Sequence, residues 1–557
     1  MAYIISDNIL SPLGGTSREN YRAVSEGRSQ LAKYAAETKR VGEPFTASLF
    51  SGEQNKAIHI NGLSPFESAI VTSARRAMND SGVADLTSAR TILIVSTTKG
   101  NTDLTSPADS AQRIGVALGI KTEPVVVCNA CISGLAAVIL AQRLLESGAY
   151  DYAVVSGADR QGRFIISGFQ SLKALSEDEC RPFDIERVGL NLGEAAATMV
   201  MSRERCDKNS WGIVAGSIRN DAYHVSAPSR NGEGLYRALR KVAEGKDLSR
   251  LAFVNAHGTA TMFNDQMESV ALDRMGLTTL PVNALKGYYG HTMGAAGLLE
   301  LILSMQATDY GRIVGTRGFE ELGVSGKIRV SAEWGTTDKR DFIKILSGFG
   351  GCNAAVWMSK DGEADKAHYQ SHFVRTHHVL ITTQGVRLDG KDIMVEGIGA
   401  DILTYIYKTM IGGYAKFYKM DRLSRLGFIA SELLLQAEGE PRYGECEDRA
   451  VILFNHSSSV DSDRKYMESI DTEGEYFPSP SVFVYTLPNI VTGEIAMRNG
   501  YHGETSFYLL PTRNERMMKD IIRVSFADDT TKSMISGWID YQDDDNFIAD
   551  IAIYHKH

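Results

Sequence analysis

Short apolar runs alternate with amphipathic stretches along residues 1–360. The runs over Thr91–Thr97, Pro124–Cys128 and Asp151–Asp159 are short, continuous and rich in β-branched residues, which predicts buried strands. Between them, Pro65–Asp80 and Ser133–Gly148 carry apolar residues at helical spacing, which predicts helices. The pattern is typical of an α/β fold with largely buried sheets, in which chemistry collects at loops that leave the strand C-termini.

The alternation lapses between Ser359 and His378, where the residues are polar and charged. We therefore predict a linker over 361–378 and a further domain over 379–557. In that domain, RAVILFNHSSS echoes RTILIVSTTKG, and SPSVFVYTLPNIVTGEIAMRNG echoes EPVVVCNACISGLAAVILAQRL. The echoes predict an internal repeat of the first half of residues 1–360. An unrelated α/β domain is the alternative.

Length and charge agree with this division. The 557 residues allow roughly three or four domain-sized units. The net charge is −9, and it is uneven: residues 1–360 carry +2, whereas residues 361–557 carry −11. The asymmetry suggests two regions with different duties. Neither region has the basic excess that nucleic-acid binding usually needs.

The cysteine content and the apolar runs bear on location. Six cysteines in a chain of this length do not make a disulfide framework, which favours a reducing compartment. The N-terminal segment lacks the basic and apolar parts of a signal peptide, and no apolar run reaches the 18 residues of a membrane span. We expect a cytoplasmic protein that neither spans a membrane nor binds nucleic acid.

Cys131 lies in the segment CNACISG, at a strand-to-helix transition. A thiol at a helix N-terminus experiences the positive end of the helix dipole, which favours the thiolate. The backbone N–H groups there can also stabilise an oxyanion. Taken alone, a buried Cys beside Ala and Gly is more often a packing residue than a nucleophile.

Three further segments place polar side chains at comparable strand ends. The first is NAHGTATMFND, which directly follows the apolar run LAFV; the second is the loop NALKGYYGHTMGAAGLLE; the third is the Gly-rich loop LSGFGGCNAAV. Their candidate residues are His257 and Asp265 in the first segment, Lys286, His291 and Glu300 in the second, and Phe349 in the third. One thiol, two imidazoles and a flexible backbone loop are thus predicted to meet at one site.

In order and approximate spacing, these segments resemble the elongating β-ketoacyl synthases of fatty-acid and polyketide assembly, which belong to the thiolase superfamily. The resemblance covers nearly all of residues 1–360 and includes the linking segment CRPFD. It implies an α/β thiolase fold, in which two duplicated βαβ halves form αβαβα layers, with halves over 1–200 and 201–360. The region over 379–557 is expected to be a further thiolase-half-like domain.

The resemblance also implies roles for the residues. Cys131 matches the nucleophile, and His257 and His291 match the two catalytic histidines. Lys286, Glu300 and Asp265 occupy supporting positions; the backbone N–H groups of Cys131 and Phe349 match the oxyanion donors, with Phe349 as the gate. The implied reaction is a decarboxylative Claisen condensation between an acyl group on Cys131 and a malonyl group on an acyl carrier protein. No metal and no cofactor are implied.

The region over 379–557 is expected to be non-catalytic. At the place we align with the nucleophile it has Asn489 or Ile490, and neither histidine segment follows. It resembles the short, Cys-less chain-length-factor-like relatives found beside aryl-polyene-type synthases. Such a domain could replace a partner subunit in cis and wall the acyl tunnel, giving a pseudo-heterodimer. The alternative is that it docks on the outside of a homodimer.

Two other functions compete with condensation. Cys352 stands where the family usually has Thr, and thiolases use a second Cys from a comparable loop, so a thiolase-like CoA-dependent acyltransferase is one alternative. Thiolases lack the HGT histidine, so His257 favours decarboxylation. The other alternative is a non-catalytic chain-length factor or scaffold, which the complete set of Cys131, His257 and His291 disfavours.

Two surface features are open to interpretation. A basic patch for the acidic carrier is predicted at Arg75 with Arg76, or at Arg237, Arg240 and Lys241 on one helix, although either could be an ordinary solvated helix face. The histidines of the linker region could suggest a metal site, but a polar linker is the simpler interpretation; these are His368, His372, His377 and His378.

Overall fold

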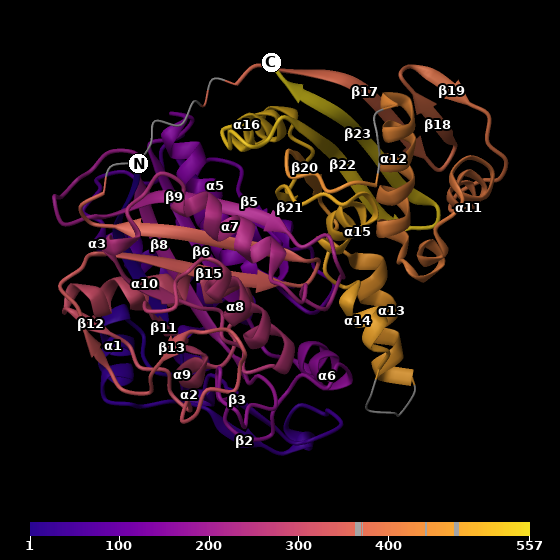
Figure 1. The fold of residues 1–557 in the computed structure, drawn as a ribbon. Helices are drawn as coiled ribbons and strands as arrows, with labels where there is room; N and C mark the ends of the chain where they lie inside the picture. The colour runs from indigo at the N-terminus through magenta and orange to yellow at the C-terminus, as the bar shows by residue number, and fades with distance from the viewer. Residues whose placement is uncertain (363–368, 370, 440–442, 473–477) are drawn as a thin grey trace.

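The computed structural model describes residues 1–362, 369, 371–439, 443–472 and 478–557. Its strands join edge to edge in one long series, and the same five-strand arrangement occurs three times along it. We call these the first, second and third units. In Figure 1, the orange and yellow elements of the C-terminal part lie beside the indigo and magenta elements of the N-terminal part. In each unit the second strand in chain order pairs in parallel with the third and the fourth, and the fifth strand pairs antiparallel with the fourth and the first.

The strands of the three units have the following bounds. The first unit contains β1 (Ala2–Leu10), β4 (Thr91–Ser96), β5 (Val125–Val127), β6 (Tyr152–Asp159) and β8 (Ala195–Ser202). The second contains β9 (Trp211–Asn220), β10 (Leu251–Asn255), β11 (Pro281–Asn283), β15 (Asp341–Gly348) and β16 (Cys352–Ser359). The third contains β17 (Phe373–Thr382), β20 (Arg449–Asn455), β21 (Thr505–Leu509), β22 (Ser533–Asp543) and β23 (Asn546–Lys556). Short strands β13 (Arg329–Val330), β18 (Gly385–Leu388) and β19 (Lys391–Ile393) extend the edges.

Small two- and three-stranded pairings lie outside this series. They are formed by β2 (Ala32–Tyr34), β3 (Phe45–Ser48) and β7 (Leu192–Gly193), and by β12 (Arg312–Ile313) with β14 (Gly335–Thr336).

The helices have the following bounds. The first unit has α1 (Ser17–Ser25), α2 (Gly52–Ile58), α3 (Pro65–Asp80), α4 (Pro107–Leu118), α5 (Ser133–Glu146) and α6 (Arg163–Ser171). The second has α7 (Glu233–Ala243), α8 (Met262–Arg274), α9 (Lys286–Tyr289) and α10 (Ala296–Asp309). The third has α11 (Asp401–Ile406), α12 (Arg422–Glu438), α13 (Val460–Thr472), α14 (Pro480–Val484), α15 (Ile490–Asn499) and α16 (Glu515–Ser525).

Two sheet edges join the units. Strand β1 pairs antiparallel with β9 and connects the first unit to the second. Strand β5 pairs antiparallel with β21, its counterpart in the third unit, through Val127 with Tyr508 and Val126 with Leu509. Since equivalent strands pair, the first and third units meet as two halves of a symmetric dimer do. The third unit therefore occupies the β5 edge and does not dock on the outside.

Helices α5 and α10 cross at the centre of the molecule, and their starts carry the loops of the predicted site. Gly134 in α5 and Gly297 in α10 let the two backbones touch: a Cβ on Gly134 would lie 3.1 Å from the Gly297 nitrogen. Helix α5 follows the Cys131 turn, and α10 follows the His291 loop. The close crossing brings these two loops together.

The hydrophobic cores are shared between units. One buried cluster contains Ile132 and Leu135, which lie close to Cys131 in sequence, together with Ile452, Met518 and Trp538 of the third unit. Burial of such apolar surface dominates folding free energy, so the third unit completes the core of the first.

Most predicted elements of the first unit are confirmed. The helix over Pro65–Asp80 begins and ends as predicted, and Ser64 and Glu67 form the expected capping box. The predicted strands agree to within two residues at either end.

Two expectations need correction. Strand β17 begins at Phe373, so the predicted linker over 361–378 extends too far; its register with β23 pairs residues 373–382 with 548–556. The run SPSVFV is not the counterpart of β5, the strand before Cys131. Pro480–Val484 is helix α14, and β21 is the third strand of the third unit. Ser479 and Pro480 begin a helix there, because Pro favours the first helical position.

The linker histidines are placed in part. His377 pairs with Asp389 at 2.9 Å and His378 with Asp550 at 2.6 Å. His372 is described without such a pair, and His368 lies outside the described residues. His377 and His378 thus each contact a separate carboxylate and do not share one ligand site.

Candidate active site

Cys131 lies in a tight turn over Ala130–Ile132, between β5 and α5. Ala130 has φ +47°, and Ser133 Oγ bridges the turn by donating to the Ala130 carbonyl at 2.6 Å and accepting from Asn129 N at 2.8 Å. The thiol keeps partial exposure. Burial in surrounding protein nevertheless raises the pKa of Cys131 to about 12, although the positive charge of Lys286 opposes this. Burial therefore opposes the thiolate that the start of the helix would favour.

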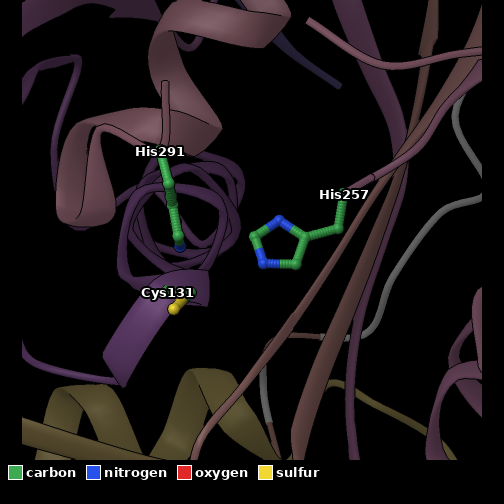
Figure 2. Close-up of side chains that lie close together, drawn as sticks. All are labelled: Cys131, His257 and His291. Carbon is green, nitrogen blue, oxygen red and sulfur yellow. The ribbon is translucent and has the colours of Figure 1, made fainter. Parts of the chain in front are cut away.

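His257 follows β10 directly, and His291 lies in the loop between α9 and α10. Their rings are 4.9 Å apart between centroids and nearly perpendicular, at 82°. One ligand atom of each histidine and the Cys131 sulfur all lie within 4.8 Å of one another. Figure 2 shows the three side chains close together at one site. Burial, followed by the charge of Lys286, lowers the pKa of both histidines well below the ordinary value of 6.5. Both imidazoles are therefore neutral near pH 7.

The hydrogen bonds leave imidazole nitrogens free for a ligand. His291 Nδ1 accepts from the Met293 amide at 3.2 Å, which puts the proton of the neutral ring on Nε2. Within the part of the chain that the structure describes, His291 Nε2 and His257 Nδ1 are buried without a partner. Buried polar atoms without partners are rare in folded proteins, so these nitrogens indicate where a ligand binds.

The predicted supporting pair is assembled, and it includes a third residue. Lys286 Nζ donates to the His257 carbonyl at 2.7 Å and pairs with Glu300 Oε1 at 2.8 Å. Lys344 on β15, which sequence reasoning missed, pairs with the other Glu300 oxygen at 2.5 Å and donates to the Ala256 carbonyl at 2.9 Å. A charged residue inside the buried run FIKIL was the available signal. Both lysines hold the backbone of the His257 loop.

Asp265 and Glu268 hold the same loop from α8. Asp265 accepts from the amides of Phe183, at 2.7 Å, and Ala260. Glu268 accepts from the amides of His257 and Gly258 at 2.6 and 2.7 Å. Glu268 was missed as well; its place one turn after Asp265 was the signal. Neither carboxylate lines the catalytic cavity, so both position the loop.

Cys131 opens onto two cavities. The outer one, of about 400 Å³, is also lined by His257, His291 and Phe349. The inner one holds only about 10 Å³ and shares Cys131, Phe169 and Phe349 with the outer one. Phe349 and Phe169 stack at 6.4 Å between ring centroids. Phe349 therefore borders both spaces.

The inner cavity is closed by the third unit. Its far wall consists of Phe483, Thr486 and Leu487. Beside them, Lys99 of the first unit pairs with Asp463 at 2.5 Å and donates to Ser459 at 3.2 Å. Residues from both ends of the chain thus form one pocket wall.

Cys352 packs beneath the loop over residues 349–351, which we call the gate loop. Its buried sulfur lies 3.3 Å from the Phe349 carbonyl and 3.6 Å from the Asn129 carbonyl. Burial raises the pKa of Cys352 far above its ordinary value, so this thiol does not ionise near neutral pH. It lines neither cavity, in contrast to the second cysteine that a thiolase mechanism needs.

The predicted basic patch on α7 is not free for a carrier. Arg237 and Arg240 pair with Glu447 of the third unit at 2.6 and 2.7 Å, and Lys241 pairs with Asp529. These cations therefore join two units of the same chain. The other predicted pair, Arg75 and Arg76 on α3, donates to backbone carbonyls.

Solved structures share this fold. A β-ketoacyl synthase from Burkholderia phymatum STM815 superposes with a TM-score of 0.59 at 23% identity, covering 64% of this chain and 98% of that one. The PfaC keto synthase–chain length factor superposes with a TM-score of 0.77 at 12% identity, covering 100% of this chain and 78% of that one. The predicted α/β thiolase fold is confirmed.

Curated proteins are similar to part of the chain. The 3-oxoacyl-[acyl-carrier-protein] synthase 2 of Rhizobium meliloti (strain 1021) is 32% identical over 255 residues, which are 42% of this chain and 60% of that protein. Nodulation protein E of Rhizobium meliloti is 31% identical over 225 residues, 39% of this chain and 56% of that protein. The chain thus spans about 60% of the length of the curated relatives that it matches.

Two family models match the chain between residues 7 and 320. Residues 7–206 match the β-ketoacyl synthase N-terminal domain, and residues 212–320 match the β-ketoacyl synthase C-terminal domain. Together they account for more than half of the 557 residues, including Cys131, His257 and His291. The chain therefore belongs to the β-ketoacyl synthase family.

Proposed function

We propose that this protein is a β-ketoacyl-[acyl-carrier-protein] synthase of fatty-acid or polyketide biosynthesis. The carrying observation is one thiol and two neutral imidazoles with unpartnered nitrogens, gathered within 4.8 Å at a cavity of about 400 Å³. The substrates are an acyl group and a malonyl group, each presented as a thioester on an acyl carrier protein. The similarity to a 3-oxoacyl-[acyl-carrier-protein] synthase supports this reading.

The first half-reaction transfers the acyl group. The sulfur of Cys131 attacks the thioester carbonyl, the carrier thiol leaves with the proton, and the acyl group stays on Cys131. The tetrahedral oxyanion is held by the backbone N–H groups of Cys131 and Phe349. The turn over Ala130–Ile132 and the Gly-rich loop after β15 meet here: a Cβ on Gly348 would lie 3.2 Å from the Cys131 nitrogen.

The second half-reaction forms the carbon–carbon bond. His257 and His291 donate N–H hydrogen bonds to the malonyl thioester oxygen, which stabilises the enolate left when carbon dioxide departs. The enolate carbon attacks the acyl-Cys131 carbonyl, and the carbon–sulfur bond breaks to release the β-ketoacyl carrier. Lys286, Glu300 and Asp265 act on this step by holding the loop that carries His257.

We also propose a division of labour along the chain. Residues 1–200 supply the nucleophile, residues 201–360 supply the histidines, and residues 379–557 form a non-catalytic unit that replaces a partner subunit in cis. The closed inner cavity supports a role for that unit in setting product length, because Phe483, Thr486 and Leu487 block the path of a growing chain. The occupied β5 edge supports the pseudo-heterodimer rather than a homodimer through this edge.

Two features bear on the carrier and on location. Met262 and Phe263 are exposed at the mouth of the outer cavity beside Lys173, a surface that suits a partner with apolar and acidic residues. No helix among the described residues is long and apolar enough to cross a membrane. The six cysteines are free. We place the protein in the cytoplasm, where thiols stay reduced.

Mass spectrometry of the intact protein tests the function. Incubation with an acyl carrier should add one acyl group, and peptide mapping should place it on Cys131, with none on the Cys131→Ala variant. Malonyl carrier should release carbon dioxide, and His257→Ala or His291→Ala should slow this release at least about 100-fold. Cys352→Ala is the matched control and should keep both activities.

Other outcomes select the alternatives. Acyl transfer to CoA without carbon dioxide release would indicate a thiolase-like acyltransferase. An unmodified Cys131 with every carrier tested would leave a non-catalytic chain-length factor or scaffold.

A further inference from the structure

The third unit contacts both backbone segments that supply the proposed oxyanion donors. On the nucleophile side, Asn129 Oδ1 accepts from the Phe507 amide at 2.7 Å, and the Cys128 amide donates to the Phe507 carbonyl at 3.1 Å. On the gate side, Asn489 Nδ2 donates to the Phe349 carbonyl at 2.8 Å. The geometry of the oxyanion site is thus held from outside the two units that carry catalytic residues.

Asn489 is placed for this contact and not for its own helix. It is the N-cap residue of α15 and is only 2% exposed, yet its side chain makes no capping hydrogen bond. An Asn at this position usually accepts from the first turn of its helix. Its Oδ1 is buried without a partner among the described residues, and an unpaired buried carbonyl is unfavourable. The side chain therefore gains its hydrogen bond from the gate loop, at a cost to local stability.

The contact lies directly on the backbone of the gate loop. A Cβ on Gly350, whose φ is +88°, would lie 2.6 Å from Asn489 Nδ2, and a Cβ on Gly493 in α15 would lie 2.5 Å from the Gly350 carbonyl. These two glycines let helix and loop touch without side chains between them. The Gly350 amide donates to Val225, and its carbonyl accepts from Asn220 at 2.8 Å. At Phe349, the carbonyl accepts from Asn489 Nδ2 at 2.8 Å and also lies 3.3 Å from Cys352 Sγ.

We propose that Asn489 is a positioning residue for the oxyanion site: by holding the Phe349 carbonyl, it aims the backbone N–H of the gate loop at the carbonyl carried by Cys131. The assignment rests on the proposed function. It predicts a selective effect. Acyl transfer to Cys131 develops negative charge at that carbonyl oxygen. Malonyl decarboxylation develops charge on the malonyl thioester oxygen, which His257 and His291 hold instead. Only the first reaction depends on Asn489.

Two substitutions and one control test the assignment in the full-length protein. Asn489→Leu keeps the branched shape of the side chain and Asn489→Ala truncates it, and both delete the donor. Each should slow acylation of Cys131 about 10-fold or more, since small displacements of catalytic groups cost up to about 100-fold. Carbon dioxide release from malonyl carrier, measured without acyl donor, should stay within about twofold of wild type. Ile495→Val, a core substitution on the same helix, should leave both rates within about twofold.

Several outcomes would overturn the assignment. These are unchanged acylation in either folded variant, an equal loss of acylation and decarboxylation, or the same selective loss in Ile495→Val. If one Asn489 variant fails to fold by circular dichroism, the other carries the same comparison. A wild-type protein that shows neither reaction would overturn the proposed function itself, and this result is distinct from a selective loss in the variants.

Discussion

At the residue scale, burial decides the chemistry of the site. Desolvation raises the pKa of the Cys131 thiol to about 12 and lowers those of His257 and His291 well below 6.5. The three groups are thus uncharged at rest, and the fixed charges lie one layer behind them, on Lys286, Lys344 and Glu300. In the proposed reaction, neutral imidazoles donate hydrogen bonds to the enolate as it forms. Because they carry no positive charge, they do not form an ion pair with the charged malonyl group, which would stabilise the ground state.

The histidine pKa shifts predict the pH dependence of decarboxylation. Because the pKa of each imidazole is lowered, each loses its proton at a more acidic pH than an ordinary histidine and stays neutral above it. Carbon dioxide release by the Cys131→Ala variant, which removes titration of the thiol, should be constant from about pH 6 to about pH 8 and fall only in more acidic solution. A midpoint between about pH 6.5 and 7 would contradict the lowered pKa values.

Lys344 gives a second prediction at this scale. Lys344→Met removes one of the two partners of buried Glu300, and deletion of a buried charge partner costs about 3–5 kcal/mol. The loss should lie near the lower end because Lys286 remains. Urea denaturation measures it, and carbon dioxide release should fall together with it.

The control for Lys344 is Lys360→Met. Lys360 is also a buried lysine, and it pairs with Asp309. Its loss should lower stability without a specific loss of decarboxylation. Equal stability of Lys344→Met and wild type would show that Lys344 does not support Glu300.

At the element scale, loops at the ends of buried strands and helices carry every proposed catalytic group, and patterns local in sequence predicted most of them. The capping box at Ser64 and the β-branched runs of β4, β5 and β6 are local signals, and these elements are confirmed. The error over Pro480–Val484 arose because VFV is apolar and β-branched, whereas the Ser–Pro pair before it starts a helix. Short apolar runs do not distinguish the two states.

Helix α14 carries the prediction on product length. Phe483→Ala should open the inner cavity and shift products toward longer chains, because the ring packs against Phe169 at 5.5 Å and lines the space beyond Cys131. Mass spectrometry of carrier-bound products measures the shift. The matched control is Phe526→Ala in the same unit, whose ring stacks on Phe373 and lines neither cavity. An unchanged product length in a folded Phe483→Ala protein would argue against the length-setting role.

At the scale of the whole molecule, the charge asymmetry marks an internal interface. Six cations of the first two units pair with six carboxylates of the third, among them Arg143 with Glu504 at 2.8 Å and Arg219 with Asp528 at 2.7 Å. The −11 of residues 361–557 therefore faces basic side chains of the same chain. Such pairs favour one relative placement of the units.

The shared core predicts that the catalytic units do not fold alone. Residues 1–362 expressed without the remainder should aggregate, because the β5 edge and the apolar cluster around Ile132 and Leu135 lose their cover. Solubility, size-exclusion chromatography and circular dichroism measure this, with full-length Cys131→Ala as the folded, inactive control. A soluble truncated protein that still accepts an acyl group at Cys131 would show that the third unit is dispensable for the site.

The sequence by itself determined the alternation of strands and helices and the internal repeat, and it singled out Cys131, His257 and His291 as candidate residues, because these depend on local periodicity and on motifs contiguous in the chain. The backbone contacts of Lys344 and Asn489 were beyond it, because each reaches a segment far away in sequence, and the contact of Glu268 depends on how its loop folds back. The protonation of Cys131 and the fate of the α7 cations were also decided only by the tertiary structure. Burial and ion pairing depend on which surfaces the fold brings together.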